Sequence, residues 1–350
     1  MRRCGLFFLL FQVIARPQSG TEPAPQQQPI QLGRVRLSPF GFFEATGVFR
    51  SAASGDDMST RFGAIPFAGS QAENLASFRN SRMALLTETN LSDIGKLSVY
   101  IEADFLNRAP AAPFRWRQYF GRFQSKNWEI LAGQAWSLLR PNRLGISTEA
   151  GLMNTRVVDA GYHVGLLGSR DRQIRIIRHM GNWQAAISLE HGTDVLPKIV
   201  HDSKRAHLEA IGLFGAKGRR GASVATVLHL GAKLDLVSQQ FWSKGGGPDA
   251  LSTIPAKVVM YSTLQGAEFK VRKGLQIFTY GGLVYGRRSS GNRAVREWTV
   301  GFAQDVFKDR FGQAVFSVQY SEPSRATWDG GRAAMKFGMI SVRHYFGVVQ

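Results

Sequence analysis

The stretch LSVYIEADF, residues 97–105, decides the fold class of this chain. Its odd-numbered positions are apolar, and its even-numbered positions carry Ser98, Tyr100, Glu102 and Asp104. A helical period of 3.6 residues would mix the two kinds of side chain on one face, whereas a strand separates them. The stretch therefore predicts a β-strand with one apolar face and one polar face.

The same period of two recurs along most of the chain from residue 35 onward. Clear examples are residues 182–190, 297–305 and 313–321, and a weaker one is residues 275–285. Short turns at 92–95, 124–127, 272–274 and 308–310 separate some of these runs. Longer stretches rich in Gly, Pro and Ser separate others: 51–71, 109–113, 141–161, 243–255, 286–292 and 321–331. Short turns at one end and long loops at the other are typical of a transmembrane β-barrel, here with about sixteen antiparallel, up-and-down strands.

Composition fits a barrel and argues against a polytopic helical membrane protein. Hydrophobic residues make up 44% of the 350 residues. After residue 15, no stretch approaches the roughly 18 continuous apolar residues that a spanning helix needs. A soluble β-sandwich or propeller would also alternate, and it remains the alternative fold. Aromatic residues near the strand ends favour the barrel because they suit interfacial girdles: Trp116, Phe120, Trp128, Trp136, Trp242, Tyr285, Trp298 and Tyr345.

The N-terminus is interpreted as an export signal. Arg2 and Arg3 precede an apolar run at residues 5–15, which suits a secretory signal peptide over residues 1–20. Residues 21–34, rich in Gln and Pro, are predicted to be a disordered or extended periplasmic lead, and residues 35–350 to be the barrel. The single cysteine, Cys4, lies inside the signal, so the exported chain is expected to hold no disulfide or thiol site.

The chain is strongly basic. Its formal net charge is +19, and without Arg2 and Arg3 it is 42 − 25 = +17. An excess of this size suggests an anionic partner, which could be nucleic acid, lipopolysaccharide or an anionic solute. Nucleic acid would not explain an export signal or lipid-like strand faces. The expected partners are therefore small anionic solutes together with outer-membrane lipid and lipopolysaccharide.

Charged residues in the middle of strands are predicted to face the lumen, because a charge facing lipid at the midplane costs about 2–4 kcal/mol. Glu102 and Asp104 then point inward. If Trp116 and Phe120 face lipid, the inward positions of residues 114–123 are Arg115, Arg117 and Tyr119; by the same argument Arg82, Arg175 and His179 point inward on their strands. Arginines opposite a few carboxylates would set up a field that admits polar anions. The alternative is that they only pair with lumen carboxylates or bind lipopolysaccharide phosphates at the rim.

Signals for catalysis are weak. The seven histidines are dispersed, and no zinc-protease, serine-hydrolase, phosphate-loop or dinucleotide motif is present, so no metal or cofactor is predicted. A barrel hydrolase using His163 or His179 with a nearby serine stays open as an alternative. A long internal loop often narrows such a barrel, and either 51–71 or 141–161 could do so.

Several runs in the first half resemble the DcaP-like outer-membrane porins. They are LSPFGFFEATGVFRS (37–51), GAIPF (63–67), RNSRMAL (79–85), YIEADFL (100–106), RWRQYFGRF (115–123) and WEILAGQAWSLLRP (128–141). The resemblance implies a sixteen-stranded barrel, trimeric, that passes small anions such as dicarboxylates across the bacterial outer membrane. It also implies that Arg79, Arg82, Arg115 and Arg117 are channel residues.

Two departures from the pattern accompany this resemblance. Phe346 is followed by Gly-Val-Val-Gln, whereas many outer-membrane barrels end on an aromatic residue, and residues 26–31 are too short for the coiled coil that some family members carry. The sequence thus predicts a non-enzymatic porin for small anionic solutes. A non-conducting structural or lipopolysaccharide-binding barrel and a barrel hydrolase are the alternatives.

Overall fold

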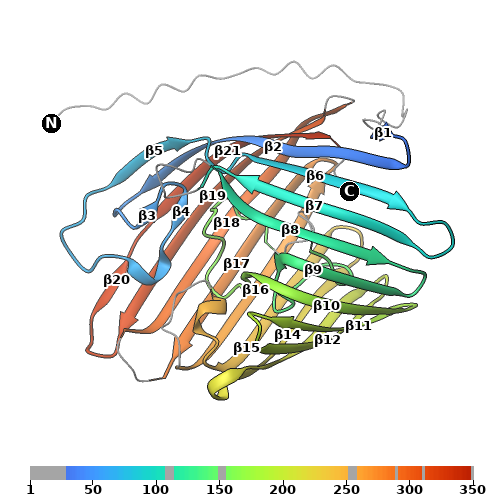
Figure 1. The fold of residues 1–350 in the computed structure, drawn as a ribbon. Coiled ribbons are helices and arrows are strands. Elements are labelled where there is room, and N and C mark those ends of the chain that lie inside the picture. Colours follow the sequence, from blue (N-terminus) through green and yellow to red (C-terminus); the bar gives the residue numbers. More distant parts are fainter. Residues whose placement is uncertain are drawn as a thin grey trace.

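The computed structural model describes residues 29–106, 114–148, 155–250, 258–287, 291–309 and 312–347. They form a closed antiparallel barrel of 16 long strands, in which each strand pairs with the next along the chain (Figure 1). The barrel closes where β2 (Val35–Arg50) pairs with β21 (Phe337–Gly347) on one side and with β6 (Arg82–Asn90) on the other. The remaining long strands are β7 (Lys96–Asp104), β8 (Arg115–Gln124), β9 (Trp128–Trp136), β10 (Arg170–Met180), β11 (Trp183–Glu190), β12 (Asp194–Asp202), β13 (Ala206–Phe214), β14 (Arg220–Leu230), β15 (Leu234–Lys244), β16 (Val259–Arg272), β17 (Leu275–Gly286), β18 (Asn292–Asp309) and β19 (Gly312–Thr327).

Shorter elements extend or cover this barrel. β1 (Ile30–Leu32) pairs with the start of β2, so part of the predicted periplasmic lead is a short strand. β5 (Glu73–Ser77) and β20 (Arg332–Ala334) pair with the long-loop ends of β2 and β19. A small hairpin of β3 (Gly55–Asp56) and β4 (Ser59–Thr60) and the 3-10 turns η1 (Phe62–Ala64), η2 (Ala216–Gly218) and η3 (Gly247–Ala250) complete the described elements. The predicted signal peptide lies outside the described residues.

The two faces of each strand follow the predicted alternation. On β7, Leu97, Val99 and Ile101 are exposed on the outer wall, whereas Ser98 and Glu102 are buried inside. An apolar outer wall without an open sheet edge suits a bilayer, in which every backbone polar group must be bonded within the protein. The chain is therefore a β-barrel of the bacterial outer membrane. None of the helical turns in the described parts of the chain is long or apolar enough to cross a bilayer.

The aromatic positions were predicted only in part. Trp116, Trp128, Trp242, Tyr285 and Trp298 are exposed on the outer wall. Phe120 and Trp136 are instead buried inside, and Tyr345 lines the lumen. These three inward aromatics pack against lumen side chains and form no part of an interfacial girdle.

A β-bulge in β8 explains the reversal at Phe120. Glu102 pairs with Gln118 and Ala103 pairs with Trp116, so Arg117 is the extra residue between them. Because a bulge inserts one residue, every later side chain moves to the opposite face. Arg117 and Gln118 both face inward, Tyr119 faces outward with 43% of its surface exposed, and Phe120 turns inward. The prediction that Tyr119 points into the lumen was wrong for this reason.

The connections between strands confirm one short-turn end and one long-loop end. The turns predicted at 92–95, 124–127 and 272–274 join β6 to β7, β8 to β9 and β16 to β17. The stretch 321–331 was predicted to be a loop, but β19 continues to Thr327, and Pro323 sits in the strand opposite Glu297. The sheet therefore extends beyond the point at which Pro, Ser and Arg make the sequence look like a loop. The predicted loop at 109–113 lies outside the described residues.

The long loop between β9 and β10, of which residues 137–148 and 155–169 are described, folds into the barrel. Its backbone N–H groups donate to inward side chains of distant strands, for example Asn142 to Glu209 at 3.2 Å and Val164 to Glu297 at 2.9 Å. The approach is close at Gly282 of β17, where an added Cβ would overlap the carbonyl oxygen of Val164. Met58 and Ile65 of the first long loop, residues 51–71, are also fully buried. They belong to one apolar cluster with Leu138, Val164 and Leu167 of the loop between β9 and β10. Both candidate loops thus occupy the long-loop half of the barrel, and the second one crosses the lumen.

Candidate functional site

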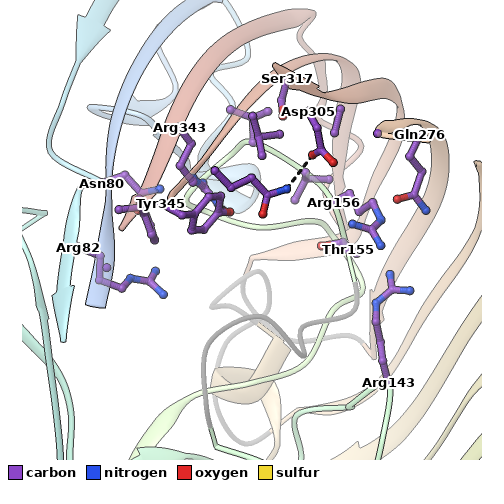
Figure 2. Close-up of a pocket in the computed structure, with 18 of the residues that line it drawn as sticks. Asn80, Arg82, Arg143, Thr155, Arg156, Gln276, Asp305, Ser317, Arg343 and Tyr345 are labelled. Carbon is purple, nitrogen blue, oxygen red and sulfur yellow. Dashed lines mark hydrogen bonds between the residues drawn. The ribbon is translucent and has the colours of Figure 1, made fainter. Parts of the chain in front are cut away.

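The long loop between β9 and β10 is called the inserted loop. A cavity of about 980 Å³ occupies the lumen between this loop and the short-turn end of the barrel (Figure 2). Its walls come from both ends of the sequence, because β2 and β21 close the barrel beside β6 and β7. Nine basic residues line it: Arg82, Arg117, Arg143, Arg156, Lys233, Lys270, Arg272, Lys273 and Arg343. Three acidic residues line it: Glu102, Asp159 and Asp305. The cavity is therefore strongly cationic.

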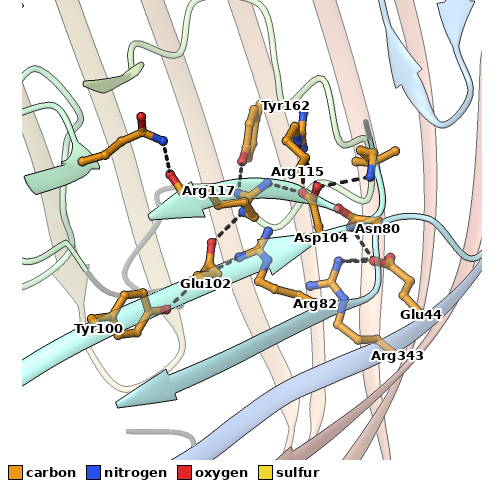
Figure 3. A network of polar contacts seen from close by, with 12 residues as sticks. Glu44, Asn80, Arg82, Tyr100, Glu102, Asp104, Arg115, Arg117, Tyr162 and Arg343 are labelled. Carbon is orange, nitrogen blue, oxygen red and sulfur yellow. Dashed lines mark hydrogen bonds and ion pairs between the residues drawn. The ribbon is translucent and has the colours of Figure 1, made fainter. Parts of the chain in front are cut away.

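Glu102 and Asp104 of β7 anchor one group of these arginines (Figure 3). Arg117 donates through Nε to Glu102 Oε1 and through Nη1 to Asp104 Oδ2, both at 2.6 Å. Arg115 makes a two-pronged bond to Asp104, at 2.9 and 2.6 Å, and Arg82 lies 3.6 Å from Glu102. Tyr100 donates its hydroxyl to Glu102 at 2.8 Å. Such charge-assisted, forked bonds fix guanidinium groups in position.

A third carboxylate, Glu44 of β2, holds Arg343 at the closure of the barrel. Arg343 Nη2 donates to both carboxylate oxygens, at 3.0 and 2.9 Å. Ser341 and Asn80 also donate to Glu44. Glu44 therefore fixes the position of the Arg343 guanidinium, which lines the cavity.

A fourth carboxylate, Glu268 of β16, holds two arginines of the inserted loop. Arg156 Nε donates to Glu268 at 2.8 Å, and Arg143 forms an ion pair with the same carboxylate. Tyr280 of β17 donates to Glu268 at 2.6 Å. Each carboxylate thus holds one or two lumen arginines and leaves the group with an excess of positive charge.

Two further arginines, Arg140 of the inserted loop and Arg170 of β10, have no carboxylate partner among the described residues. The Arg140 guanidinium lies 3.9 Å from the centre of the Trp136 ring and 4.5 Å from that of Tyr162. All three of its nitrogens are buried without a hydrogen bond in the described structure. Arg170 stacks on Trp136 at 4.8 Å. Ring faces attract a cation but do not neutralise it.

The hydroxyl of Tyr162 lies among these positive charges. Its hydroxyl accepts a hydrogen bond from Arg117 Nη2 at 3.2 Å. Burial alone would raise the pKa of Tyr162, but the guanidinium groups of Arg117, Arg140 and Arg170 lower it to about 7. Burial, together with the charges of Arg117 and Arg82, lowers the pKa of Arg140 to about 10, so this arginine stays protonated near neutral pH. The inserted loop thus carries a tyrosine whose charge changes near neutral pH.

Asp159 and His163 fasten the inserted loop to its surroundings. Asp159 Oδ1 accepts from the N–H groups of Thr60, at 3.1 Å, and Gly161, at 2.6 Å, and so joins the two long loops. Burial raises the pKa of Asp159 to about 6 and lowers that of His163 to about 4. His163 is therefore neutral over the physiological range, and its Nδ1 bonds to the Val164 carbonyl at 2.7 Å.

The predicted channel residues occupy different places. Arg82, Glu102 and Arg117 line the cavity, and Asp104 and Arg115 pack directly behind them. Arg175 points inward, as predicted, but it is buried beneath the inserted loop and donates to the Trp136 carbonyl at 2.6 Å. Their part in conduction stays a prediction.

Arg79 and Tyr119 lie away from the cavity. Arg79 sits in the turn between β5 and β6 at the long-loop end, where it pairs with Asp57 at 3.1 Å and its side chain is 48% exposed. Arg79 was expected in the channel only from the resemblance to DcaP-like porins, and the turn between β5 and β6 places it outside the strands of the wall. Tyr119 faces outward because of the bulge in β8.

Sequence reasoning missed Arg343 and Glu268 as well as the loop residues Arg140, Arg143, Arg156 and Tyr162. Alternation could have found the first two, since Val342 and Phe269 beside them are exposed on the outer wall. For the loop, the usable signal was its apolar content, because Leu138, Leu139, Val164 and Leu167 are unusual in a loop that faces water. All four are buried.

The histidines considered for a hydrolase form no serine–histidine pair in the described structure. His163 faces Glu297 at 3.6 Å, and His179 Nε2 is buried without a hydrogen-bond partner there. Within the described residues, no group of three or more His, Cys, Asp and Glu side chains could hold a metal ion.

Comparison with known proteins places the fold among outer-membrane channels. No family model and no curated protein matches the sequence. The outer membrane channel DcaP of Acinetobacter baumannii is similar in structure, with a TM-score of 0.74 at 16% identity over 91% of this chain and 100% of that one. OmpT of Vibrio cholerae, folded in vitro, gives 0.61 at 8% identity over 91% and 100%. A mutant porin of Rhodopseudomonas blastica gives 0.52 at 9% identity over 89% and 100%. The resemblance to DcaP-like porins is thus confirmed at the level of the fold.

Proposed function

We propose that this barrel is a porin for the passive diffusion of small anionic solutes such as dicarboxylates. The observation that carries the proposal is the lining of the lumen cavity, in which nine basic side chains face three acidic ones. Guanidinium groups keep their charge throughout the physiological pH range and bind carboxylates in a forked geometry. A dicarboxylate that enters from the short-turn end would lose part of its hydration shell and accept hydrogen bonds from these guanidinium groups instead.

The arrangement of the arginines favours weak binding and release of a solute over tight binding. Arg82, Arg117 and Arg343 are held by wall carboxylates, so they offer a solute only part of their donors. Conduction requires sites that attract a solute and still release it. A row of partly satisfied arginines meets that requirement better than one fully unsatisfied pocket would.

Liposome swelling tests the proposed solute class directly. Proteoliposomes should swell faster in a succinate salt than in arabinose, a neutral solute of similar size. Equal rates for both solutes would remove the anion preference. Swelling in neither solute would remove the porin function itself.

A second candidate function is a barrel that conducts poorly until the inserted loop moves. The observation in its favour is the apolar cluster that packs both long loops into the barrel, with Met58, Ile65 and Leu167 fully buried. Planar-bilayer recordings separate the two functions, because an open porin conducts steadily whereas a plugged barrel stays closed or conducts only in rare bursts.

We also propose that the chain acts without catalysis, that its N-terminal residues 1–20 are an export signal, and that it assembles as a homotrimer in contact with outer-membrane lipopolysaccharide. Trimerisation is supported by the porin-like fold; one similar structure is described as a trimer form of Vibrio cholerae OmpT. Native mass spectrometry of detergent-extracted protein tests the assembly. An assay for ester and phospholipid hydrolysis on the same sample tests the absence of catalysis.

A further inference from the structure

Arg178 of β10 is a charged side chain on the outer wall of the barrel. The exposed residues Ile174, Ile176 and Met180 mark the lipid-facing side of β10, and Arg178 lies in the same alternation. It is two residues from the short-turn end of the strand. A long basic side chain at this depth can reach the headgroups of the nearer leaflet, whereas the same charge at the midplane would be costly.

The Arg178 guanidinium pairs with no carboxylate among the described residues. Its described contact is the ring of Trp128, its cross-strand neighbour, whose centre lies 4.7 Å away. The carboxylate at this end of β12, Asp202, points into the barrel and bonds to His207 at 2.7 Å. The turn that follows, Ser-Lys-Arg at residues 203–205, is exposed and adds two positive charges. The outer rim over β10–β13 is therefore cationic.

Two tryptophans show that this rim lies at the membrane interface. Trp128 begins β9 and Trp183 begins β11, and about half of each side chain is exposed on the outer wall. Exposed tryptophans at strand ends lie at the depth of the headgroups. His201 of β12 pairs with Trp183, and the two ring centres are 4.5 Å apart. The imidazole adds a group that can donate a hydrogen bond beside the guanidinium of Arg178.

A hollow of about 320 Å³ leads away from this rim on the same outer wall. It begins at Trp183 and His201 and extends as far as Gln240. Gln240 lies in the middle of β15, so the hollow rises from the rim toward the middle of the membrane across the tilted strands β11–β15 (Figure 1). Its floor is mostly apolar and includes Ile199, Leu208, Ala210 and Val224.

We infer that the outer wall over β10–β15 binds one glycerophospholipid, with its phosphate at Arg178 and His201 and one acyl chain along the hollow. The short turns of such barrels face the periplasm, and glycerophospholipids form the leaflet on that side of the outer membrane. A guanidinium binds phosphate oxygens in a forked geometry, which supplies the missing counter-charge of Arg178. The apolar floor of the hollow suits an acyl chain, and the site is separate from the lumen and does not depend on conduction.

The headgroup site is tested by titrating the full chain in detergent with dioleoylphosphatidylglycerol and counting bound lipids by native mass spectrometry. Arg178→Gln should raise the dissociation constant about fivefold, the effect of one basic residue near an anionic headgroup. Arg172→Gln is the matched control, because Arg172 is exposed on the same face of β10 but near its long-loop end. This variant should bind as the unaltered chain does. The heat-dependent gel shift of a folded barrel checks the fold of both variants.

The acyl-chain site is tested by filling the hollow. Ala210→Leu adds bulk on the outer wall alone, so the barrel should fold as before. The dissociation constant should rise about fourfold for each methylene group of the lipid that leucine displaces. Ala132→Leu is the control, because Ala132 is also exposed on the outer wall but lies on β9, outside the hollow. It should leave the dissociation constant unchanged.

Dioleoylglycerol, which has the same acyl chains and no phosphate, separates the two parts of the site. It should bind the unaltered chain at least about fivefold more weakly than the phospholipid does. Equal affinities for the two lipids, or equal dissociation constants for Arg178→Gln and Arg172→Gln, would overturn the phosphate site. Phospholipid binding to Ala210→Leu that is as tight as to the unaltered chain would overturn the hollow as the place of the acyl chain. Loss of a protein contact in Arg178→Gln with lipid binding unchanged would overturn the lipid as occupant.

Discussion

The lumen holds two groups of arginines in contrasting surroundings. Arg82, Arg115 and Arg117 project from strands, and each lies against the carboxylate of Glu102 or Asp104. Arg140 of the inserted loop lies against the rings of Trp136 and Tyr162, and Arg170 lies against that of Trp136; neither has a carboxylate partner among the described residues. The charge of the paired arginines is largely balanced by the neighbouring carboxylates, so these arginines mainly stabilise the wall of the barrel. The five arginines face two carboxylates, Glu102 and Asp104, so the region has a net positive charge, and the two unpaired arginines supply most of it.

The largest expected effect comes from removing a carboxylate of the paired group. Asp104→Ala leaves Arg117 buried with one carboxylate in place of two, and Arg115 without its forked partner. Breaking a buried ion pair from one side costs about 3–5 kcal/mol. We expect the free energy of unfolding, measured in urea with lipid vesicles, to fall by that amount.

Arg140→Met is the matched control for this loss. The Arg140 guanidinium makes no hydrogen bond within the described structure, and methionine can keep the contact with both rings. The free energy of unfolding should fall by about 1 kcal/mol or less. The variant loses the cation–ring attraction but no longer buries a charge, and the two effects oppose each other. Equal losses for the two variants would contradict the division into paired and unpaired arginines.

The second effect is on ion selectivity. Arg140→Met removes an unneutralised charge, so it should lower the chloride-to-potassium permeability ratio by about twofold, the combined effect on both ions of one charge about 8 Å away in a water-like dielectric, screened over roughly one Debye length. The double variant Glu44→Met/Arg343→Met removes a neutral pair and should leave the ratio nearly constant. Reversal potentials across a salt gradient measure both, and the opposite ranking would overturn the argument from net charge.

The third effect is a dependence on pH. The pKa of Tyr162 is lowered to about 7, so the side chain is neutral below that pH and becomes an anion above it. Because the arginines remain charged, ionisation of Tyr162 by itself lowers the net positive charge of the region by nearly one as pH rises from 6 to 8. The preference for chloride should therefore decrease by up to about twofold over this range.

Tyr162→Phe isolates this effect from the other loop groups. Asp159, with a pKa raised to about 6, also gains its negative charge as pH rises, whereas His163, with a pKa near 4, stays neutral. Above pH 7, where Asp159 is ionised, the variant should show no further change in selectivity. A variant that keeps the full pH dependence there would assign it to another group.

The smallest effect is expected at Tyr119. Its ring faces outward and its hydroxyl bonds to Gln134, so Tyr119→Phe should alter neither conductance nor selectivity beyond experimental scatter. A clear change in either quantity would mean that the bulge in β8 is misplaced and that Tyr119 lines the lumen.

Much of the wall could be predicted from the sequence, because an outer face in lipid enforces alternation. Glu102, Arg82 and Arg117 were placed in the lumen on this ground. The alternation cannot reveal an inserted residue, however, and a single bulge at Arg117 reversed Tyr119 and Phe120. Nor does it describe a loop that leaves the sheet, which is why Arg140 and Tyr162 were missed. Their positions depend on contacts made across the barrel, such as Val164 with Glu297, which no local pattern encodes.

The most direct test of the central claim, that the cationic lining makes this barrel an anion-selective porin, is the reversal potential of single channels in a potassium chloride gradient. The unaltered protein should prefer chloride, and Arg82→Ala/Arg117→Ala should shift the potential toward cation preference. A cation-selective channel whose reversal potential is unchanged by this double substitution would contradict the claim.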